Sequence, residues 1–187
     1  RGSAAFDATT FALVGRASYD QFESDRRRGP RFFGGVNARR AVTDLVDAFA
    51  EVGYNIRDGR SDVFDTRDWT AKLNLDYSLG RRGVLYFSGE FRRGDLVSTG
   101  PSSLANVGLA EVFAPDDAFP GMDLFAYRFQ GRTVLGTVGW NYPLGPRDSL
   151  DLSWRRVYST PLDRPSFDGG STRYNVNQYS LVYLMRF

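Results

Sequence analysis

The sequence predicts an all-β protein in which eight antiparallel strands follow one another as an up-and-down meander. Three observations predict this fold. Apolar and polar residues alternate over long stretches, glycine- and proline-containing turns separate these stretches, and tyrosine (10), phenylalanine (15) and glycine (20) are abundant. Successive side chains of a strand point to opposite faces of a sheet, so a period of two sorts apolar and polar residues onto different faces.

The clearest strand is WTAKLNLDYSL, which begins at Trp69. One of its faces carries only apolar residues, namely Trp69, Ala71, Leu73, Leu75, Tyr77 and Leu79. The turn GRRG follows, and VLYFSGEFRRG then resumes the alternation, which is the pattern of a β-hairpin. The segment TVGWNYPLGPRDSLDLSWRRVY has the same design, so the two hairpins look like weak repeats.

The stretch ARRAVTDLVDAFAEVGYNIRD admits two interpretations, because its alanine, leucine, valine and glutamate residues also suit a helix. Strict alternation from Val46 to Arg57 favours a strand. The predicted strands cover residues 8–20, 31–39, 45–57, 69–79, 84–93, 129–142, 150–158 and 174–187. The connections 40–44, 80–83 and 143–149 are short, whereas 21–30, 58–68, 94–128 and 159–173 are long.

Composition excludes several kinds of chemistry. Cysteine and histidine are absent, which excludes disulfides, thiolate nucleophiles, imidazole bases and most zinc sites. No run of apolar residues is long enough for a transmembrane helix. The net charge of +2 gives no reason to expect a nucleic-acid partner. Nearly all of the basic residues are arginines, and Lys72 is the single lysine. No cofactor and no metal site are expected.

The predicted polar faces carry equal numbers of positive and negative residues away from the strand ends. The cations are Arg16, Arg57, Lys72, Arg92, Arg155 and Arg186, and the anions are Asp20, Asp47, Glu51, Asp76, Glu90 and Asp151. A narrow, closed interior needs this balance, because a buried charge is tolerable only when it is paired. We therefore predict an interior salt-bridge network, formed by Arg16, Asp47, Glu51, Lys72, Asp76, Glu90, Arg92, Asp151 and Arg155. The alternative is the solvated face of a soluble sandwich.

The predicted apolar faces place aromatic residues near the strand ends and aliphatic residues between them. The aromatic set is Trp69, Tyr77, Trp140, Tyr142, Tyr158 and Phe187. Amphipathic rings at both borders of an aliphatic band are typical of a transmembrane β-barrel, whereas a soluble core has no reason to sort aromatic residues by depth. The sequence thus predicts an antiparallel up-and-down transmembrane β-barrel of eight strands, with charged residues inside and apolar residues outside.

The segment NQYSLVYLMRF ends the chain on alternating apolar residues. They are Tyr179, Leu181, Tyr183, Met185 and Phe187. This ending resembles the carboxy-terminal signal of bacterial outer-membrane β-barrel proteins, and TDLVDAFAEVGYN resembles a hairpin of the small eight-stranded OmpA and OmpX type. The resemblance implies that these five residues form an assembly signal, which the barrel-assembly machinery recognises during biogenesis.

The same resemblance implies a location in the bacterial outer membrane, among its lipid and lipopolysaccharide. An even number of strands places both termini and the short turns in the periplasm and the long loops outside. We expect one domain spanning residues 1–187. The abrupt start at RGSAAFDATTF leaves open that this domain is the C-terminal part of a larger barrel.

The leading functional interpretation is a non-enzymatic barrel that acts as a structural, scaffold or binding protein through its long loops. The enzymes among such barrels resemble one another in using histidine, which this sequence lacks. The alternatives are a narrow pore, or the C-terminal portion of a larger transport or secretion barrel. A soluble ligand-binding barrel is a more distant alternative.

Two long loops hold candidate binding residues. The first contains Arg26, Arg27 and Arg28, which are predicted to contact lipopolysaccharide phosphate or to form an ordinary solvated turn. The connection 94–128 is unusually apolar, and its candidate residues are Leu109, Val112, Phe113, Phe119 and Phe125. We expect a short amphipathic helix in SLANVGLAEVF. The loop is predicted either to fold back over the barrel mouth as a lid or to dock onto a protein partner.

Overall fold

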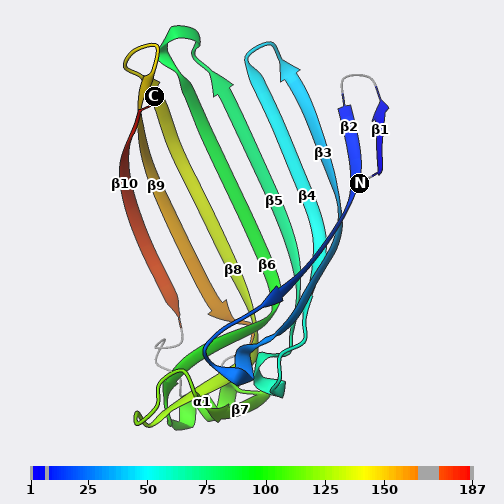
Figure 1. Cartoon of the computed structure of the whole chain (residues 1–187), viewed down its shortest axis with the longest axis vertical. Helices are drawn as coiled ribbons and strands as arrows, with labels where there is room; N and C mark the ends of the chain where they lie inside the picture. Colours follow the sequence, from blue (N-terminus) through cyan, green and yellow to red (C-terminus); the bar gives the residue numbers. More distant parts are fainter. Residues whose placement is uncertain (1, 7–8, 164–172, 186–187) are drawn as a thin grey trace.

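The computed structural model describes residues 2–6, 9–163 and 173–185. Its strands form one antiparallel sheet, in which strands that follow one another in the chain lie side by side (Figure 1). The order is β1-β2-β3-β4-β5-β6-β8-β9-β10, and the short strand β7 pairs with β8. The predicted all-β antiparallel meander is therefore confirmed.

Each of the eight predicted strands corresponds to one long strand of the sheet. The strands are β1 (Gly2–Phe6), β2 (Thr9–Asp20), β3 (Gly29–Thr43), β4 (Val46–Arg57), β5 (Thr66–Ser78), β6 (Val84–Pro101), β7 (Val112–Pro115), β8 (Leu124–Pro143), β9 (Asp148–Pro161) and β10 (Tyr174–Met185). The helical segments are η1 (Asp25–Arg27), η2 (Asp62–Phe64), η3 (Gly80–Arg82) and α1 (Leu104–Leu109). The stretch with two interpretations forms the end of β3 and the whole of β4, so the strand interpretation is confirmed.

The connection between residues 94 and 128 is more ordered than the sequence predicts. β6 continues to Pro101 and pairs with β8 back to Leu124. Alternation does not reveal this extension, because small and polar residues occupy both faces of VSTGP. Of the segment SLANVGLAEVF, in which a helix is predicted, only the residues of α1 are helical. The Ser103 side chain caps this helix by accepting a hydrogen bond from the amide of Asn106 (3.1 Å). From Val112 the chain forms β7.

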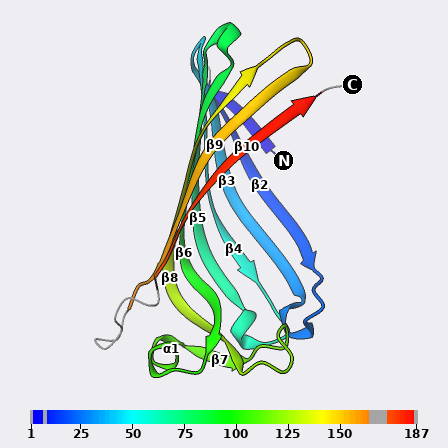
Figure 2. The same ribbon diagram turned by 90° about the vertical axis from the view of Figure 1, so that its left-hand side faces the viewer.

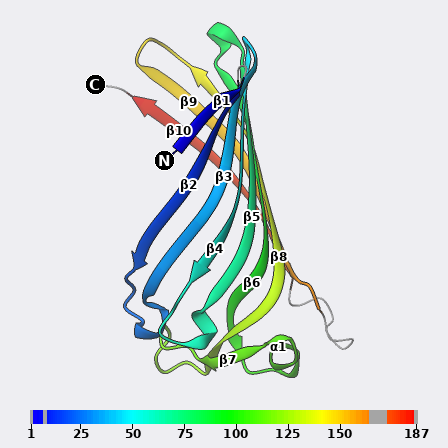
Figure 3. The same ribbon diagram turned by 90° about the vertical axis from the view of Figure 1, so that its right-hand side faces the viewer.

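The sheet is not closed into a barrel. Within the described residues, β10 pairs only with β9, and the opposite edge is formed by β2 and the short β1. Figures 2 and 3 show the sheet from either side as a curved, open trough. The long connections gather at one end, which we call the loop end, and the short turns gather at the other, the turn end.

The pairing register sorts the side chains onto two unlike faces. On the concave face, β4 and β5 place Glu51 opposite Lys72, whereas on the convex face Val52 lies opposite Ala71. Glu51 is 3% exposed, but the convex Leu13 is 67% exposed. The curvature of the sheet therefore encloses the charged, concave face, and the apolar, convex face points outward.

The short turn between β5 and β6 depends on glycine. Gly83 has a φ of +91°, a conformation that residues with a side chain rarely adopt. A Cβ atom at this position would lie 1.9 Å from the backbone oxygen of Asn141 on β8. The glycine thus allows the turn to approach the neighbouring hairpin.

A small apolar core joins two of the long connections at the loop end. Val63 and Phe64 of η2 are buried together with Ala126 of β8. Val97, Val112 and Ala114 pack against this group. Among the residues that the structure describes, no helix has the length and apolar character needed to cross a membrane.

Candidate functional site, a basic pocket on the concave face

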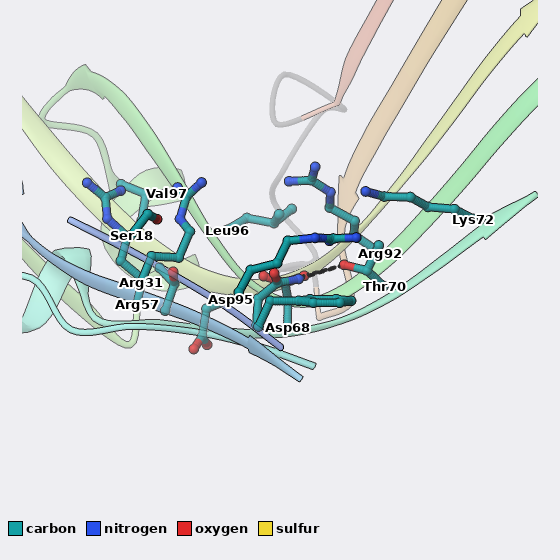
Figure 4. Close-up of a pocket in the computed structure, with 14 residues that line it drawn as sticks. Ser18, Arg31, Arg57, Asp68, Thr70, Lys72, Arg92, Asp95, Leu96 and Val97 are labelled. Atoms are coloured by element: carbon teal, nitrogen blue, oxygen red, sulfur yellow. Dashed lines mark hydrogen bonds between the residues drawn. The ribbon is translucent and has the colours of Figure 1, made fainter. Parts of the chain in front are cut away.

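A pocket of about 450 Å³ lies on the concave face near the loop end (Figure 4). Five adjacent strands, β2 to β6, each contribute one cationic side chain to its lining. These cations are Arg16, Arg31, Arg57, Lys72 and Arg92. We call this the basic pocket. Alternation is the local reason for its composition, because every second residue of these strands faces the concave side.

Glu51 of β4 lies beneath the pocket and binds two of its cations. Arg16 Nη2 is 2.5 Å from Glu51 Oε2, and a second hydrogen bond joins Arg16 Nη1 to Oε1 at 3.2 Å. Lys72 Nζ is 3.8 Å from Oε1. The guanidinium of Arg16 also lies over the ring of Phe33, 4.5 Å from its centroid. A carboxylate as buried as that of Glu51 is tolerable because both cations neutralise it.

Asp20 has the same role at the loop end of the pocket. Its Oδ2 atom is 3.2 Å from Arg31 Nη2 and 3.4 Å from Arg57 Nε. Arg57 also donates a hydrogen bond from Nη2 to the carbonyl oxygen of Arg27 in η1 (2.6 Å). The pocket is thereby connected to the first long loop.

Glu90 of β6 completes the series of acids. It lies 3.9 Å from Lys72 Nζ and pairs with Arg92 on its own strand. Each cation of the basic pocket therefore has an acidic partner.

Most of the cations are more exposed than the acids that pair with them, although Arg57 (16%) and Asp20 (19%) are similarly enclosed. The Arg16 side chain is 50% exposed and its partner Glu51 is 3% exposed, while Arg92 is 51% exposed and Glu90 is 17% exposed. The pocket therefore presents guanidinium and ammonium groups to solvent, although its total charge is nearly balanced. Such a surface suits carboxylates and phosphates, to which arginine can donate two parallel hydrogen bonds.

Neutral polar groups occupy one side of the pocket. The Asp68 carboxylate accepts hydrogen bonds from the Asn55 amide (2.9 Å) and the Thr70 hydroxyl (2.9 Å). Asn55 also donates to the Thr70 hydroxyl (2.8 Å). Asp68 and Asp95 are the two carboxylates among the residues that line the pocket. Within the described residues, no cluster of acidic side chains is arranged to hold a metal ion.

The structure brings part of the predicted interior network together. Residues that meet in or beneath the basic pocket are Arg16, Glu51, Lys72, Glu90 and Arg92. Asp47 and Asp76 instead lie opposite each other on β4 and β5, in a separate pocket of about 200 Å³ that Arg39 also lines. Neither aspartate has an ion-pair partner among the described residues.

The two predicted network residues of β9 also lie apart from the pocket. Asp151 accepts a hydrogen bond from the hydroxyl of Tyr86 (2.9 Å). Arg155 lies between Thr137 and Gln178 in the register and forms no ion pair with any described residue. The charged contacts are therefore concentrated on β2 to β6.

Sequence reasoning missed Arg31 and left Arg57 and Asp20 outside the predicted network. Arg31 is the first residue of the glycine-weakened segment RFFGGVNAR, where alternation is hard to follow. Period-two counting back from Arg39 would have placed Arg31 and Phe33 on the charged face.

The arginines of the first long loop have partners within the protein. Arg28 pairs with Asp25 at 2.7 Å and donates a hydrogen bond to the carbonyl oxygen of Phe22 (2.6 Å). Arg26 and Arg27 reach the β6–β8 connection, where Arg26 donates to a backbone carbonyl oxygen at 2.5 Å. Contact between these arginines and lipopolysaccharide stays a prediction.

The β6–β8 connection folds back onto η1. Arg27 Nη2 lies 2.5 Å from Oδ2 of Asp116, which is buried and also accepts a hydrogen bond from the Thr99 hydroxyl (2.6 Å). Asp117 accepts a hydrogen bond from the Ser24 hydroxyl (2.5 Å). We call these contacts the loop latch.

The pKa of Asp117 reflects its place in the latch. Partial burial opposes the charged form, but hydrogen bonds from the Ser24 hydroxyl and the Arg26 amide favour that form more strongly. Together they lower the pKa of Asp117 below its ordinary value.

The predicted lid or partner residues divide into two groups. Leu109, Val112 and Phe125 are partly buried, and Val112 packs against the loop-end core. Phe113 stacks on Tyr127 with ring centroids 6.0 Å apart, but remains exposed. Phe119 is also exposed.

The predicted assembly-signal residues lie on one face of β10. Tyr179, Leu181, Tyr183 and Met185 share the convex face and are all exposed. Phe187 lies outside the described residues.

The convex face has few charges. In the described parts of β2, β4 and β10, the convex positions carry no charged residue. Arg40 stands near the turn end of β3, and β5, β6 and β8 carry convex arginines on the loop-end side of the sheet. Arg156 of β9 is also convex and donates a hydrogen bond to the side chain of Asn175 (3.3 Å). Between them lie Leu, Val, Ala, Phe and Gly residues, including Leu13, Val52 and Leu73.

Comparison of the chain with protein-family models, with curated proteins and with solved structures found no match.

Proposed function

We propose that this chain forms part of the wall of a bacterial outer-membrane β-barrel whose basic pocket binds or conducts anionic solutes. The observation that carries the proposal is the arrangement of charge, because cations from five adjacent strands line the pocket while Glu51 and Glu90, which pair with three of them, lie more deeply buried. A lumen lined in this way favours carboxylates and phosphates over cations. The proposed role is non-catalytic.

The convex face supports a lipid environment. A soluble protein rarely exposes a continuous apolar surface that covers one face of a long sheet. Here Leu13, Val52 and Leu73 belong to such a surface, and Trp69 and Trp140 stand toward its opposite ends. This distribution is typical of strands that cross a bilayer.

The open edges favour a barrel larger than eight strands over a closed eight-stranded scaffold. Side chains fill the interior of an eight-stranded barrel, whereas the basic pocket is an open space of about 450 Å³. The edges at β2 and β10 expose backbone groups that a lipid environment would leave unsatisfied. We propose that further strands complete the ring.

The proposal includes a route of assembly and an orientation. The exposed apolar row Tyr179, Leu181, Tyr183 and Met185 supports recognition of β10 by the barrel-assembly machinery. We propose that the turn end and both chain ends face the periplasm and that the loop end faces the exterior, in contact with lipopolysaccharide.

A scaffold or binding role is the second candidate. It is favoured by apolar side chains that the loop latch leaves exposed, namely Leu104, Phe113, Phe119 and Met122. These side chains would contact a protein partner outside the cell.

Ion selectivity tests the first candidate. The full chain is inserted into lipid bilayers, and the reversal potential is measured across a potassium chloride gradient. We expect a preference for chloride that falls in an Arg16→Gln/Arg92→Gln variant. The matched control, Arg40→Gln/Arg81→Gln, removes the same charge from the turn end and should retain the preference.

Two results would reject the anion proposal. A preference for potassium over chloride would contradict the role of the basic pocket. A chain that inserts as a compact, heat-sensitive band on a gel but does not conduct would favour the scaffold role. Failure of the chain to insert by itself would contradict closure of these strands alone and would favour a ring completed by further strands.

A further inference from the structure

We propose that three arginines on the convex face form a binding site for the phosphate groups of lipid headgroups. They are Arg67 of β5, Arg93 of β6 and Arg132 of β8, and we call them the arginine belt. The belt lies on the face opposite the basic pocket. This inference rests on the proposed function, because only a membrane barrel would present its convex face to lipid.

The register forces two of these arginines together. Arg93 and Arg132 occupy directly opposed positions on β6 and β8, and both are exposed. Side chains at opposed positions of an antiparallel pair are close neighbours, so two like charges there repel each other. Trp69 lies opposite Arg93 on the other side, and Arg67 precedes Trp69 by two positions on the same face. An anion bridging the arginines would remove the repulsion.

No acidic side chain neutralises the belt. Within the described residues, none of its guanidinium groups forms an ion pair or a hydrogen bond. The acids near the belt bind other groups. Asp65 accepts a hydrogen bond from the backbone amide of Gly59 (2.7 Å). Asp95 accepts hydrogen bonds from the side chain of Gln130 and from the backbone amide of Arg67, and Glu111 pairs with Arg128 (3.8 Å).

The contrast with the concave face makes this absence informative. Every cation of the basic pocket has a carboxylate within 4 Å, for example Arg16 with Glu51 and Arg31 with Asp20. Within the described residues, the cations of the basic pocket are therefore paired, whereas the arginines of the belt are not. The positive charge of the belt is therefore available to an anion that comes from outside the described residues.

The surroundings of the belt match the depth of lipid headgroups. A pocket of about 580 Å³ adjoins it. Arg67, Arg93 and the rings of Tyr54 and Trp69, whose centroids lie 4.9 Å apart, line this pocket together with the carboxylates of Asp65, Asp95 and Glu111. One register step toward the turn end, the convex face is apolar from Val52 to Val134. Amphipathic rings favour the border between hydrocarbon and water, where an arginine is also far less costly than at the bilayer centre.

Phosphate is the headgroup chemistry that this geometry fits. A guanidinium donates two parallel hydrogen bonds to phosphate oxygens, so neighbouring arginines can hold one group between them. The side chains project outward at the edge of the apolar surface. A phosphate anchored in the membrane therefore suits the belt better than a free ion.

Lipid retention tests the inference. The full chain is inserted into phosphatidylcholine vesicles that contain bisphosphorylated lipid A, then extracted into mild detergent, and the retained lipid A is quantified by native mass spectrometry. We expect an Arg93→Gln/Arg132→Gln variant to retain at least about tenfold less lipid A than the unmodified chain. The Arg40→Gln/Arg81→Gln control should match the unmodified chain. An Arg93→Lys/Arg132→Lys variant should show intermediate retention.

Each outcome has a distinct meaning. Equal retention by the Arg93→Gln/Arg132→Gln variant and the unmodified chain, with both giving the same heat-dependent gel shift, would overturn the belt and leave the barrel proposal intact. Complete displacement of lipid A by inorganic phosphate would identify a site for free anions and overturn the lipid assignment.

Discussion

Replacing Glu51 by alanine tests whether the acids behind the basic pocket hold its cations in place. The Glu51 side chain is 3% exposed and pairs with Arg16 and Lys72, which are 50% and 33% exposed. Removing one partner of a buried ion pair costs about 3–5 kcal/mol. Solvent screens the two cations left behind, because both are partly exposed, so we expect the free energy of unfolding to fall by about 1–3 kcal/mol.

Equilibrium unfolding in urea measures this loss. The chain in lipid vesicles reports its unfolding through the fluorescence of its three tryptophans. The control is Glu23→Ala, which removes an exposed loop carboxylate that has no ion-pair partner among the described residues. Glu51→Ala should also increase the preference for chloride, because it leaves Arg16 and Lys72 unneutralised. Equal stability of the two variants would refute the anchoring role of Glu51.

Three further predictions concern the convex face, a turn and the loop latch. Leu73→Arg should destabilise the membrane-inserted protein by about 2–4 kcal/mol, measured by the same unfolding assay; tolerance of arginine here would contradict the lipid-facing assignment. Gly83→Ala should cost about 1–3 kcal/mol, because it combines a positive φ with a clash against Asn141, and unchanged unfolding would show that the turn can rearrange. Because the pKa of Asp117 is lowered in the folded state, its contribution to stability is complete above its ordinary pKa and is lost as pH falls through the lower folded value. Hydrogen exchange in residues 112–118, normalised to intrinsic rates, should therefore accelerate in acid, and Asp117→Asn should abolish that dependence; a pH-independent rate in the unmodified chain would exclude the latch contact to Ser24.

The sequence predicts the meander because the two faces of each strand differ so strongly. In β5, every position that the alternation assigns to the apolar face is a convex position in the register. The rule fails where composition no longer differs between the faces, as in the end of β6 around Ser98 and Thr99. It also gives no information on β1, whose residues GSAAF are mostly small.

Closure of the sheet is not a local property. Alternation within β2 and β10 indicates their faces but says nothing about which strand lies beyond either edge. The predicted count of eight long strands is correct for the described residues, yet their pairing leaves both edges open.

The candidate site was predictable in its residue types and less so in its pairings. Counting charges on alternate positions identifies Glu51, Lys72 and Glu90 as inward residues. Their pairing depends on the register between β4, β5 and β6, which the turns set. The loop latch joins Arg27 to Asp116, which are 89 residues apart, so no local pattern could predict it.

The loop latch has a consequence for the order in which the molecule assembles. Ser24 and Asp117 are separated by 93 residues, and all the strands from β3 to β7 lie between them in the chain. Contacts of such long sequence separation carry a large loop-closure entropy and form late. Hairpins such as β5–β6 can pair as soon as their residues are available, whereas the latch must wait until the intervening strands are in register. We therefore expect the strand wall to form first and the mouth at the loop end to close last, so that a kinetic intermediate has paired strands and a still unlatched outer end.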